Sequence, residues 1–365
     1  MPSDRGGVGR YVDNLLTALD RGGEVQLAVA CQRADADRYG RALTGTEVVP
    51  GPAAIAHRPA RLAWEQTGLP LVAEQLGADV VHSPHYTIPL RSGRPVVVTL
   101  HDATFFTAPE VHSTVKATFF RSATRTALRR AARCVVPSAA TRDELVRVVD
   151  AEPSTIDVVH HGVDTALFHL PDDDELARVR ARLALGDRDY VAFLGMLEPR
   201  KNVPALIRGW VRACSGRPDP PVLVLAGNSG WDDEVDSAVA GVPAELRVIR
   251  PGYLRVEDLR GFLGGAVVVA YPSLGEGFGL PVLEAMACGA PVLTSRRLAL
   301  PEVGGDAVAY TDVDDASIGE SLAALLDDPD RRAQLARAGA ERAASFTWDA
   351  TAAGHVAAYR RALDG

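Results

Sequence analysis

Two glutamates in one glycine-rich stretch have the types and the spacing that chemistry needs. Glu276 and Glu284 lie in Gly275–Cys288, which reads Gly-Glu-Gly-Phe-Gly-Leu-Pro-Val-Leu-Glu-Ala-Met-Ala-Cys. Its glycines let the backbone approach a ligand closely, and Pro281 has the ring geometry of a first helical residue. Because a helix N-terminus attracts anions, we interpret the stretch as a phosphate site whose two carboxylates hold two ends of one ligand.

Two adjacent cations, Arg200 and Lys201, form the second candidate group. They stand in Glu-Pro-Arg-Lys-Asn, just after an apolar run that ends at Gly195. Fixed positive charge stabilises a departing diphosphate where its negative charge develops. An Arg-Lys pair beside a helix start is more often merely solvated, but its position after a strand favours a functional role.

The histidines offer weaker signals. His101 follows a strand-like run, from where it can reach a substrate or serve as a hydrogen-bonded structural residue. His82 and His85 form an H-x-x-H pattern without an evident third ligand, so we predict no metal site. We assign His160 and His161 to a linker.

Composition and charge narrow the class of protein. The 365 residues exceed the usual size of one domain, and their net charge of −8 argues against general nucleic-acid binding. Residues 1–165 carry 18 basic and 18 acidic side chains, so the excess of acid lies in the second half. The four cysteines are isolated, which is typical of reduced thiols in the cytoplasm, and no apolar run reaches the length of about 18 residues that spans a bilayer.

Short apolar runs alternate with amphipathic stretches along the whole chain. The first series of expected strands is Val25–Ala30, Asp79–Ser83, Pro95–His101, Cys134–Pro137 and Ile156–Val159. The second series is Tyr190–Gly195, Val222–Gly227, Leu246–Arg250, Ala266–Tyr271, Pro291–Thr294 and Ala307–Tyr310. Helical stretches are expected around Thr67–Leu76, Thr114–Ala132 and Thr141–Val149, with Thr141 and Glu144 at capping-box spacing.

This alternation predicts an α/β protein with two doubly wound, parallel-sheet domains of the Rossmann type that face a cleft. We place the domains at residues 1–165 and 166–345, followed by a final helix in 346–365. Ligands of such sheets bind at the carboxyl ends of the strands.

A glycine loop, Gly6–Gly9, precedes a helical pattern over Tyr11–Leu19. Such a loop normally follows the first strand of a parallel sheet, yet only five residues stand before it. We therefore expect the first strand of the N-terminal domain to be missing from the chain as given.

One expected helix, near Lys116–Arg133, is strongly basic. Arg121, Arg125 and Arg129 share one face by the i,i+4 rule. This face suits an anionic membrane surface, although a solvated face is the more frequent reason for such a pattern.

Taken together, these motifs resemble the retaining glycosyltransferases of family 4, which have the GT-B fold. The resemblance extends from Gly6–Gly9 to Phe346-Thr-Trp-Asp, and the E-x7-E element of Glu276 and Glu284 is its most specific part. Four further segments point to the subgroup rich in mannosyltransferases: Leu100–Ala103, Glu198–Asn202, Ala226–Trp231 and Pro251–Tyr253.

The resemblance implies that the second domain binds a nucleotide-sugar donor. It assigns the diphosphate to Arg200 and Lys201. It assigns the ribose hydroxyls to Glu284 and the hydroxyls of the transferred sugar to Glu276. Backbone contacts to the base, phosphates and sugar are implied for Gly252, Tyr253, Gly277, Phe278, Gly279 and Leu280.

For the first domain, the resemblance places Gly7 and Gly9 at the diphosphate and acceptor, and His101 at the sugar near its reacting carbon. It also implies that the final helix packs back onto this domain. Many members carry arginine where this chain has Met196, so Arg200 is expected to replace that charge.

The implied activity is transfer of a hexose, in the first place mannose from GDP-mannose, to a hydroxyl of a glycan or lipid-linked acceptor. The resemblance implies retention of configuration, no cofactor and no metal. The expected location is the cytoplasm, with peripheral contact to the inner face of the cell membrane. Three alternatives stay open: a nucleotide-sugar epimerase, an NAD-dependent oxidoreductase, and a non-catalytic partner that binds nucleotide sugars.

Overall fold

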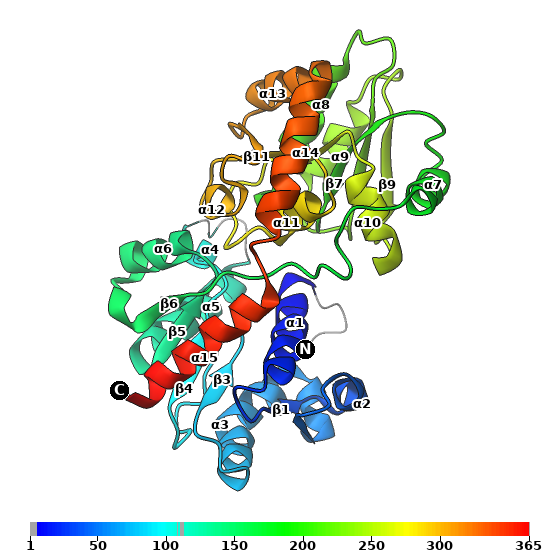
Figure 1. The fold of residues 1–365 in the computed structure, drawn as a ribbon. Helices are drawn as coiled ribbons and strands as arrows, with labels where there is room; N and C mark the ends of the chain where they lie inside the picture. The colour runs from blue at the N-terminus through cyan, green and yellow to red at the C-terminus, as the bar shows by residue number, and fades with distance from the viewer. Residues whose placement is uncertain (1–5, 108, 110–112, 365) are drawn as a thin grey trace. The chain divides into compact units, whose positions relative to one another are not determined.

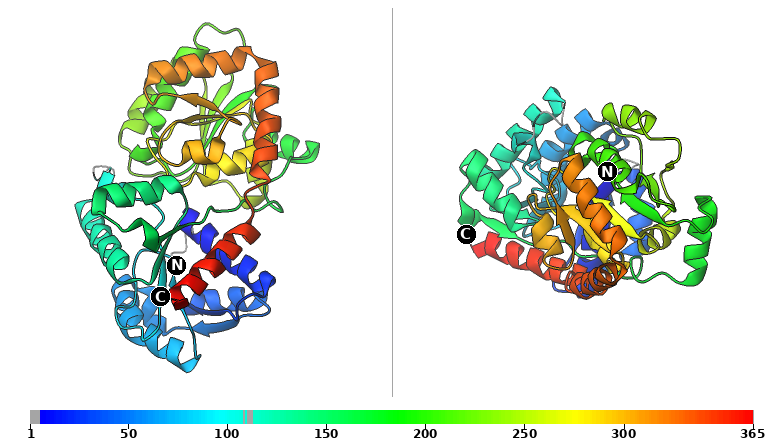
Figure 2. Two further views of the ribbon diagram at one scale, coloured as in Figure 1. Left: turned by 60° about the vertical axis from the view of Figure 1, so that its left-hand side comes forward. Right: turned by 90° about the horizontal axis from the view of Figure 1, so that it is seen from above.

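The computed structural model describes residues 6–107, 109 and 113–364, which form two compact units (Figure 1). Unit 1 extends to Gly162 and resumes at Thr347, whereas unit 2 spans Val163–Phe346. The last helix, red in Figure 1 and in both views of Figure 2, therefore belongs to unit 1 with the N-terminal part of the chain.

Unit 2 contains one sheet of six parallel strands in the order β12-β11-β10-β7-β8-β9. The strands are β7 (Tyr190–Leu194), β8 (Val222–Ala226), β9 (Val248–Gly252), β10 (Val268–Tyr271), β11 (Val292–Ser295) and β12 (Ala309–Thr311). Its helices are α7 (Asp173–Arg182), η4 (Pro199–Lys201), α8 (Val203–Cys214), α9 (Glu234–Ala240), α10 (Val256–Gly264), α11 (Leu280–Ala287), α12 (Leu300–Gly304), α13 (Asp315–Asp327) and α14 (Pro329–Ala343).

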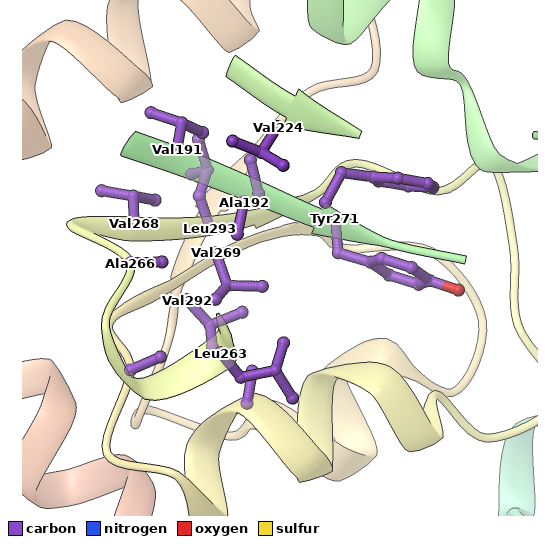
Figure 3. Close-up of a cluster of buried hydrophobic side chains, with 14 of the residues drawn as sticks. Val191, Ala192, Val224, Leu263, Ala266, Val268, Val269, Tyr271, Val292 and Leu293 are labelled. Carbon is purple, nitrogen blue, oxygen red and sulfur yellow. The ribbon is translucent and has the colours of Figure 1, made fainter. Parts of the chain in front are cut away.

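The inner strands of this sheet are buried along almost their whole length and are mainly apolar, because helices cover both faces. Figure 3 shows side chains of β7, β8, β10 and β11 packed together with Leu263 of α10. This core fixes the strands whose carboxyl ends carry the candidate site.

Unit 1 has two separate parallel sheets, β1-β2 and β3-β4-β5-β6. The strands are β1 (Ala28–Cys31), β2 (Glu47–Pro50), β3 (Val81–Ser83), β4 (Val96–Thr99), β5 (Arg133–Val136) and β6 (Ile156–Val158). The helices are α1 (Gly6–Gly22), α2 (Arg33–Ala42), η1 (Ala53–Ala56), α3 (Arg58–Gln75), α4 (Thr104–Thr107), α5 (Thr114–Arg130), α6 (Ala139–Val149), η3 (Pro153–Thr155) and α15 (Trp348–Asp364).

The predicted α/β architecture with parallel sheets in both halves is confirmed. The first element in the described part of the chain is α1, so no described strand precedes the glycine segment. Within these residues the parallel strands of unit 1 do not join into one sheet.

Three local predictions need correction. Gly7 and Gly9 lie inside the first turns of α1 rather than in a loop ahead of it. The N-cap of α6 is Ser138, whose side chain accepts from the N–H of Thr141, so Thr141 is not the cap. The strand Glu47–Pro50 was not predicted, because it is short and its pattern is half exposed.

A buried chain of hydrogen bonds joins α1 and α15 to β4. His355 Nδ1 lies 2.8 Å from the carbonyl oxygen of Thr351, so this nitrogen must carry the proton. In neutral imidazole the other nitrogen accepts, and the hydroxyl of Tyr11 donates to it over 2.9 Å. Tyr11 in turn accepts from the hydroxyl of Thr99 at 2.8 Å.

The same reasoning extends the chain to β3. With its own proton directed at Tyr11, Thr99 must accept from His82 Nε2 at 2.9 Å. His82 Nδ1 is then an acceptor, and the hydroxyl of Tyr359 donates to it over 2.9 Å. One direction of donation thus satisfies every member while both imidazoles stay neutral.

Five imidazoles of unit 1 have depressed pKa values, and burial is the largest cause in each. The pKa falls to about 3 for His85 and about 4 for His355. It is also lowered for His82, His101 and His161, with neighbouring histidines adding to the effect on His82 and His161.

These shifts predict an acid-labile unit 1. As the pH falls below about 6.5, the unfolded chain binds protons at these imidazoles while the folded chain does not. Each imidazole therefore lowers the free energy of unfolding by up to about 1.4 kcal/mol per pH unit until its folded pKa is reached. The melting temperature should fall between pH 7 and pH 5, and less steeply in His161→Phe, which keeps the aromatic contact with Trp348.

The matched control is His57→Gln, since His57 is exposed. It should leave the pH dependence of the melting temperature unchanged. An equal pH dependence in His161→Phe and the wild type would contradict the explanation.

Candidate functional site

The two cations of the candidate site stand on a single 3-10 turn after β7. Pro199 begins this turn, η4, and Arg200 and Lys201 complete it. Asn202 then adopts a left-handed conformation, with φ 59° and ψ 34°, from which α8 begins. Its amide donates to the carbonyl oxygens of Pro272 (3.2 Å) and Val313 (2.7 Å), so the turn is tied to the segment after β10.

The segment after β10 holds Glu276 in place. Ser295 at the end of β11 donates to the carbonyl oxygen of Ser273 at 2.6 Å. The N–H of Leu274 donates to the carbonyl oxygen of Arg200 at 2.8 Å. The turn η4 and the segment after β10 are thus joined by a main-chain hydrogen bond in addition to the side-chain amide of Asn202.

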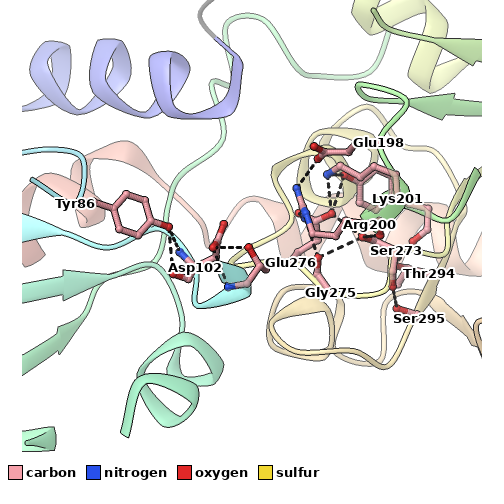
Figure 4. Close-up of polar contacts among 12 residues, drawn as sticks. Tyr86, Asp102, Glu198, Arg200, Lys201, Ser273, Gly275, Glu276, Thr294 and Ser295 are labelled. Carbon is pink, nitrogen blue, oxygen red and sulfur yellow. Dashed lines mark hydrogen bonds and ion pairs between the residues drawn. The ribbon is translucent and has the colours of Figure 1, made fainter. Parts of the chain in front are cut away.

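Glu276 forms ion pairs with both predicted cations (Figure 4). Its Oε1 lies 2.7 Å from Lys201 Nζ, and its Oε2 lies 2.5 Å from Arg200 Nη1. Arg200 Nη2 also pairs with Glu198 at 2.8 Å. All four side chains have exposed fractions of 16% or less, so this is a mostly buried charge cluster.

Two hydroxyl groups that the sequence reasoning missed complete the cluster. Tyr271 donates to Glu276 Oε1 at 3.1 Å, and Ser273 lies 2.8 Å from the same oxygen. The ammonium of Lys201 also contacts the Tyr271 hydroxyl. Their only sequence signal was their position at the end of β10, because neither belongs to a charged motif.

The charges at this site are set by opposing effects. Burial alone raises the pKa of Glu276, but the positive charges of Arg200 and Lys201 outweigh it and lower the pKa to about 2. Burial and the charge of Arg200 lower the pKa of Lys201, against the opposite effect of Glu276. Because the carboxylate is ionised throughout the neutral range, it stabilises the charged ammonium, and we take the pair as ionised.

Three residues after Glu276, a glycine in the left-handed conformation precedes the first residue of α11. Gly279 is the N-cap, with φ 110°, and a Cβ there would lie 2.9 Å from Leu300 Cδ2. The first helical residue is Leu280, so Pro281 is the second and not the first as predicted. Val282 and Leu283 donate to the Gly279 carbonyl. Among the described residues, no main-chain carbonyl accepts a hydrogen bond from the N–H groups of residues 279 and 280.

The other residues that were predicted to bind the nucleotide sugar follow β9 and β10 or lie on α11. Glu284 lies on α11 and is buried, with an exposed fraction of 3%. Gly277 and Phe278 are buried in the turn before the helix. Gly252 ends β9 with φ 73°, whereas the side chain of Tyr253 is 63% exposed.

In unit 1, His101 is held by a hydrogen bond of 2.9 Å between its Nε2 and the carbonyl oxygen of Pro84. Because a carbonyl only accepts, Nε2 carries the proton and Nδ1 of the neutral ring is an acceptor. The hydroxyl of Tyr86 bridges the main chain of Asp102, donating to its oxygen (3.1 Å) and accepting from its nitrogen (2.9 Å) (Figure 4). The segment after β4 is therefore rigidly positioned.

His160 and His161 lie in the segment without regular structure that leads to the boundary between the units, as expected of a linker, but the side chain of His161 is buried. Its ring lies in the core of unit 1, with centroids 4.8 Å from Tyr11 and 5.9 Å from Trp348. The aromatic partner comes from a segment almost two hundred residues away, which local sequence cannot reveal. His82 and His85 belong to the same buried region, and the described residues contain no group of three or more His, Cys, Asp or Glu that could hold a metal.

Sequence comparison places both halves of the chain among known families. Residues 5–167 match Glycosyltransferase Family 4, and residues 173–342 match Glycosyl transferases group 1. The O-antigen chain mannosyltransferase B of Escherichia coli is 32% identical over 77% of this chain and 74% of its own. The D-inositol 3-phosphate glycosyltransferase of Mycolicibacterium paratuberculosis is 37% identical over 60% of this chain, which spans 50% of that relative.

Solved structures show the same fold at low identity. HepE of Anabaena in complex with UDP-glucose has a TM-score of 0.75 at 19% identity, covering 97% of this chain and 95% of its own. Sucrose-phosphate synthase of Thermosynechococcus elongatus has a TM-score of 0.76 at 21% identity, covering 97% of this chain and 93% of its own.

The site geometry predicts a graded effect of substitutions at Asn202. Asn202→Ala removes two hydrogen bonds and forces a left-handed alanine, which should lower the free energy of unfolding by about 2–4 kcal/mol. Asn202→Gly removes the same hydrogen bonds without the backbone strain, so its loss should be smaller. Chemical denaturation of the two variants checks this order, and equal losses would show that the left-handed conformation costs nothing.

Proposed function

Since the chain belongs to glycosyltransferase family 4 and has the GT-B fold, we propose that it transfers a hexose from a nucleotide sugar with retention of configuration. The favoured donor is GDP-mannose, and the acceptor is a hydroxyl of a glycan or a lipid-linked sugar. The observation that carries this proposal is the buried contact of Arg200 and Lys201 with Glu276 after β7 and β10.

The proposed chemistry depends on stabilising the departing diphosphate. Arg200, Lys201 and the N-terminus of α11 supply positive charge where the leaving group gains negative charge. The acceptor hydroxyl attacks from the side that the diphosphate leaves, and a phosphate oxygen of the donor takes its proton. The protein then acts by orientation and charge, and no metal is required.

Sugar recognition is assigned to the E-x7-E element. Glu276 binds hydroxyls of the transferred hexose and Glu284 those of the ribose, while the main chain at Gly277–Leu280 and Gly252–Tyr253 completes the contacts. Gly7, Gly9 and His101 keep their predicted roles toward the diphosphate, acceptor and sugar.

The choice of mannose rests on the relatives. The E. coli relative is named as a mannosyltransferase, whereas the HepE structure contains UDP-glucose. The former is 32% identical to this chain and the latter 19%, and the higher identity favours mannose.

The basic face of α5 supports a peripheral membrane contact. Thr118, Arg121, Ser122, Arg125 and Arg129 line a groove of about 280 Å³. The guanidinium of Arg125 lies 5.0 Å from the ring centre of Phe106, and Val115 is 82% exposed. Cations beside exposed apolar area suit an anionic headgroup layer. Among the described residues, no helix combines the length and hydropathy of a membrane span.

One assay distinguishes two alternative functions from sugar transfer. A nucleotide-sugar epimerase converts the donor without an acceptor, and a binding partner shows neither conversion nor transfer. Incubating the protein with GDP-mannose alone and then with acceptor distinguishes all three.

The transfer assay tests the site directly. We expect Lys201→Ala to lower kcat/KM by at least about a hundredfold, because one preorganised charge at the leaving group is lost. Transfer by the wild type should persist in EDTA. The matched control is Arg208→Ala, an exposed cation on the adjacent helix α8. Near-normal turnover in a folded Lys201→Ala protein would refute the assignment, and loss of transfer in EDTA would refute its metal independence.

Vesicle binding tests the contact through α5. The double variant Arg125→Ala/Arg129→Ala should bind vesicles of 30% phosphatidylglycerol about ten- to a hundredfold more weakly, at about 1 kcal/mol per cation. Arg33→Ala/Arg41→Ala removes the same charge from exposed positions of α2 and should bind like the wild type. Equal weakening in both would indicate net charge rather than this face.

A further inference from the structure

Glu276 occupies a cage of four donors in the candidate site. Its Oε1 lies within 3.1 Å of the hydroxyls of Tyr271 and Ser273 and of the ammonium of Lys201. Its Oε2 pairs with Arg200. Both carboxylate oxygens are therefore held, and the cage is built from four different positions of the sequence.

The same donors suit a phosphate group. Arginine, lysine and hydroxyl groups bind anionic oxygens of carboxylates and phosphates by the same charge-assisted hydrogen bonds. Arg200 Nη1 is already engaged by Glu276 and by the carbonyl oxygen of Gly275, and Nη2 is engaged by Glu198. An arriving diphosphate must therefore compete with Glu276 for the two cations.

The balance of charge makes this competition strong. Arg200 and Lys201 carry two positive charges, and Glu198 and Glu276 carry two negative ones, so the buried cluster is neutral. A diphosphate added without any displacement would leave uncompensated negative charge in a mostly buried place, which is costly. One of the two carboxylates has to move away.

Glu276 is the carboxylate suited to move. It forms ion pairs with both cations, whereas Glu198 forms one with Arg200. It also stands between Gly275 and Gly277, whose wide range of backbone conformations permits a local rearrangement.

We infer that Glu276 is an internal competitor of the donor: its carboxylate occupies the diphosphate position in the unliganded protein and is displaced when a nucleoside diphosphate binds. This inference rests on the proposed function and describes how the same site is regulated. Displacement frees the carboxylate for the hydroxyls of the sugar. Recognition of the sugar is thereby coupled to binding of the diphosphate.

The inference predicts a gain of affinity on removing the competing charge. Glu276→Gln keeps the shape of the side chain but loses both ion pairs. Its affinity for GDP, UDP and inorganic pyrophosphate, measured by calorimetry, should rise by at least about tenfold, which corresponds to roughly 1.4 kcal/mol. Hexose transfer should fall in the same variant, since the contact with the sugar is weakened.

Three further variants make the test specific. Glu276→Asp keeps the charge but is one methylene shorter, so it holds the two cations less well and should show a smaller gain. Glu198→Gln should also gain less than Glu276→Gln, because it releases Arg200 alone. Glu257→Gln is the matched control, since Glu257 is exposed and pairs with Arg255 at 3.2 Å, and its affinity should equal that of the wild type.

Unchanged or weaker binding of pyrophosphate to both Glu276 variants would overturn the inference and leave the proposed function standing. A gain in Glu257→Gln equal to that in Glu276→Gln would also overturn it, because net charge would then explain both. If the wild type and Glu276→Gln bind none of the three probes and transfer no sugar, the proposed function and the inference both fail.

Discussion

The candidate site depends on the pairing of two parallel strands, β7 and β10. They are hydrogen-bonded neighbours with Val268 opposite Val191, so their carboxyl ends meet at the same edge of the sheet. Residues 195–267 separate these strands in sequence, yet the turn η4 and the segment before α11 emerge side by side. The buried ion pairs of Glu276 follow from this pairing.

Burying four charged side chains is favourable only if the partners are held in position. Here two hydrogen bonds hold the segments that carry them: the main-chain N–H of Leu274 donates to the carbonyl of Arg200, and the side-chain amide of Asn202 donates to that of Pro272. Tyr271, the last residue of β10, stacks on Phe193 of β7 with ring centres 5.7 Å apart. Its hydroxyl therefore reaches Glu276 from a rigid base, and the apolar core sets the geometry of the charges.

Alternating apolar and amphipathic segments were sufficient to predict the fold class, because buried parallel strands are continuous Val-rich runs. Arg200, Lys201 and Glu276 could be singled out because each follows a strand or a glycine turn. Their mutual contact could not be predicted, since it requires the strand order. Tyr271 and Ser273 were missed because a neutral hydroxyl at a strand end has no distinctive pattern. The burial of His161 was missed for a different reason: its stacking partner Trp348 lies on the final helix, far away in sequence.

The two units illustrate different uses of buried polar groups. The chain through Tyr11, Thr99 and His355 is neutral, and its single direction of donation is fixed by a carbonyl group at its end. Adding a proton to His355 Nε2 would require the hydrogen bonds from Tyr11 to His355 and from Thr99 to Tyr11 to reverse, so the chain resists change. The cluster around Glu276 is charged, and its two cations can exchange one anion for another without losing their hydrogen bonds. A neutral network therefore suits the anchoring of helices, whereas a charged one suits a site whose ligand is itself an anion.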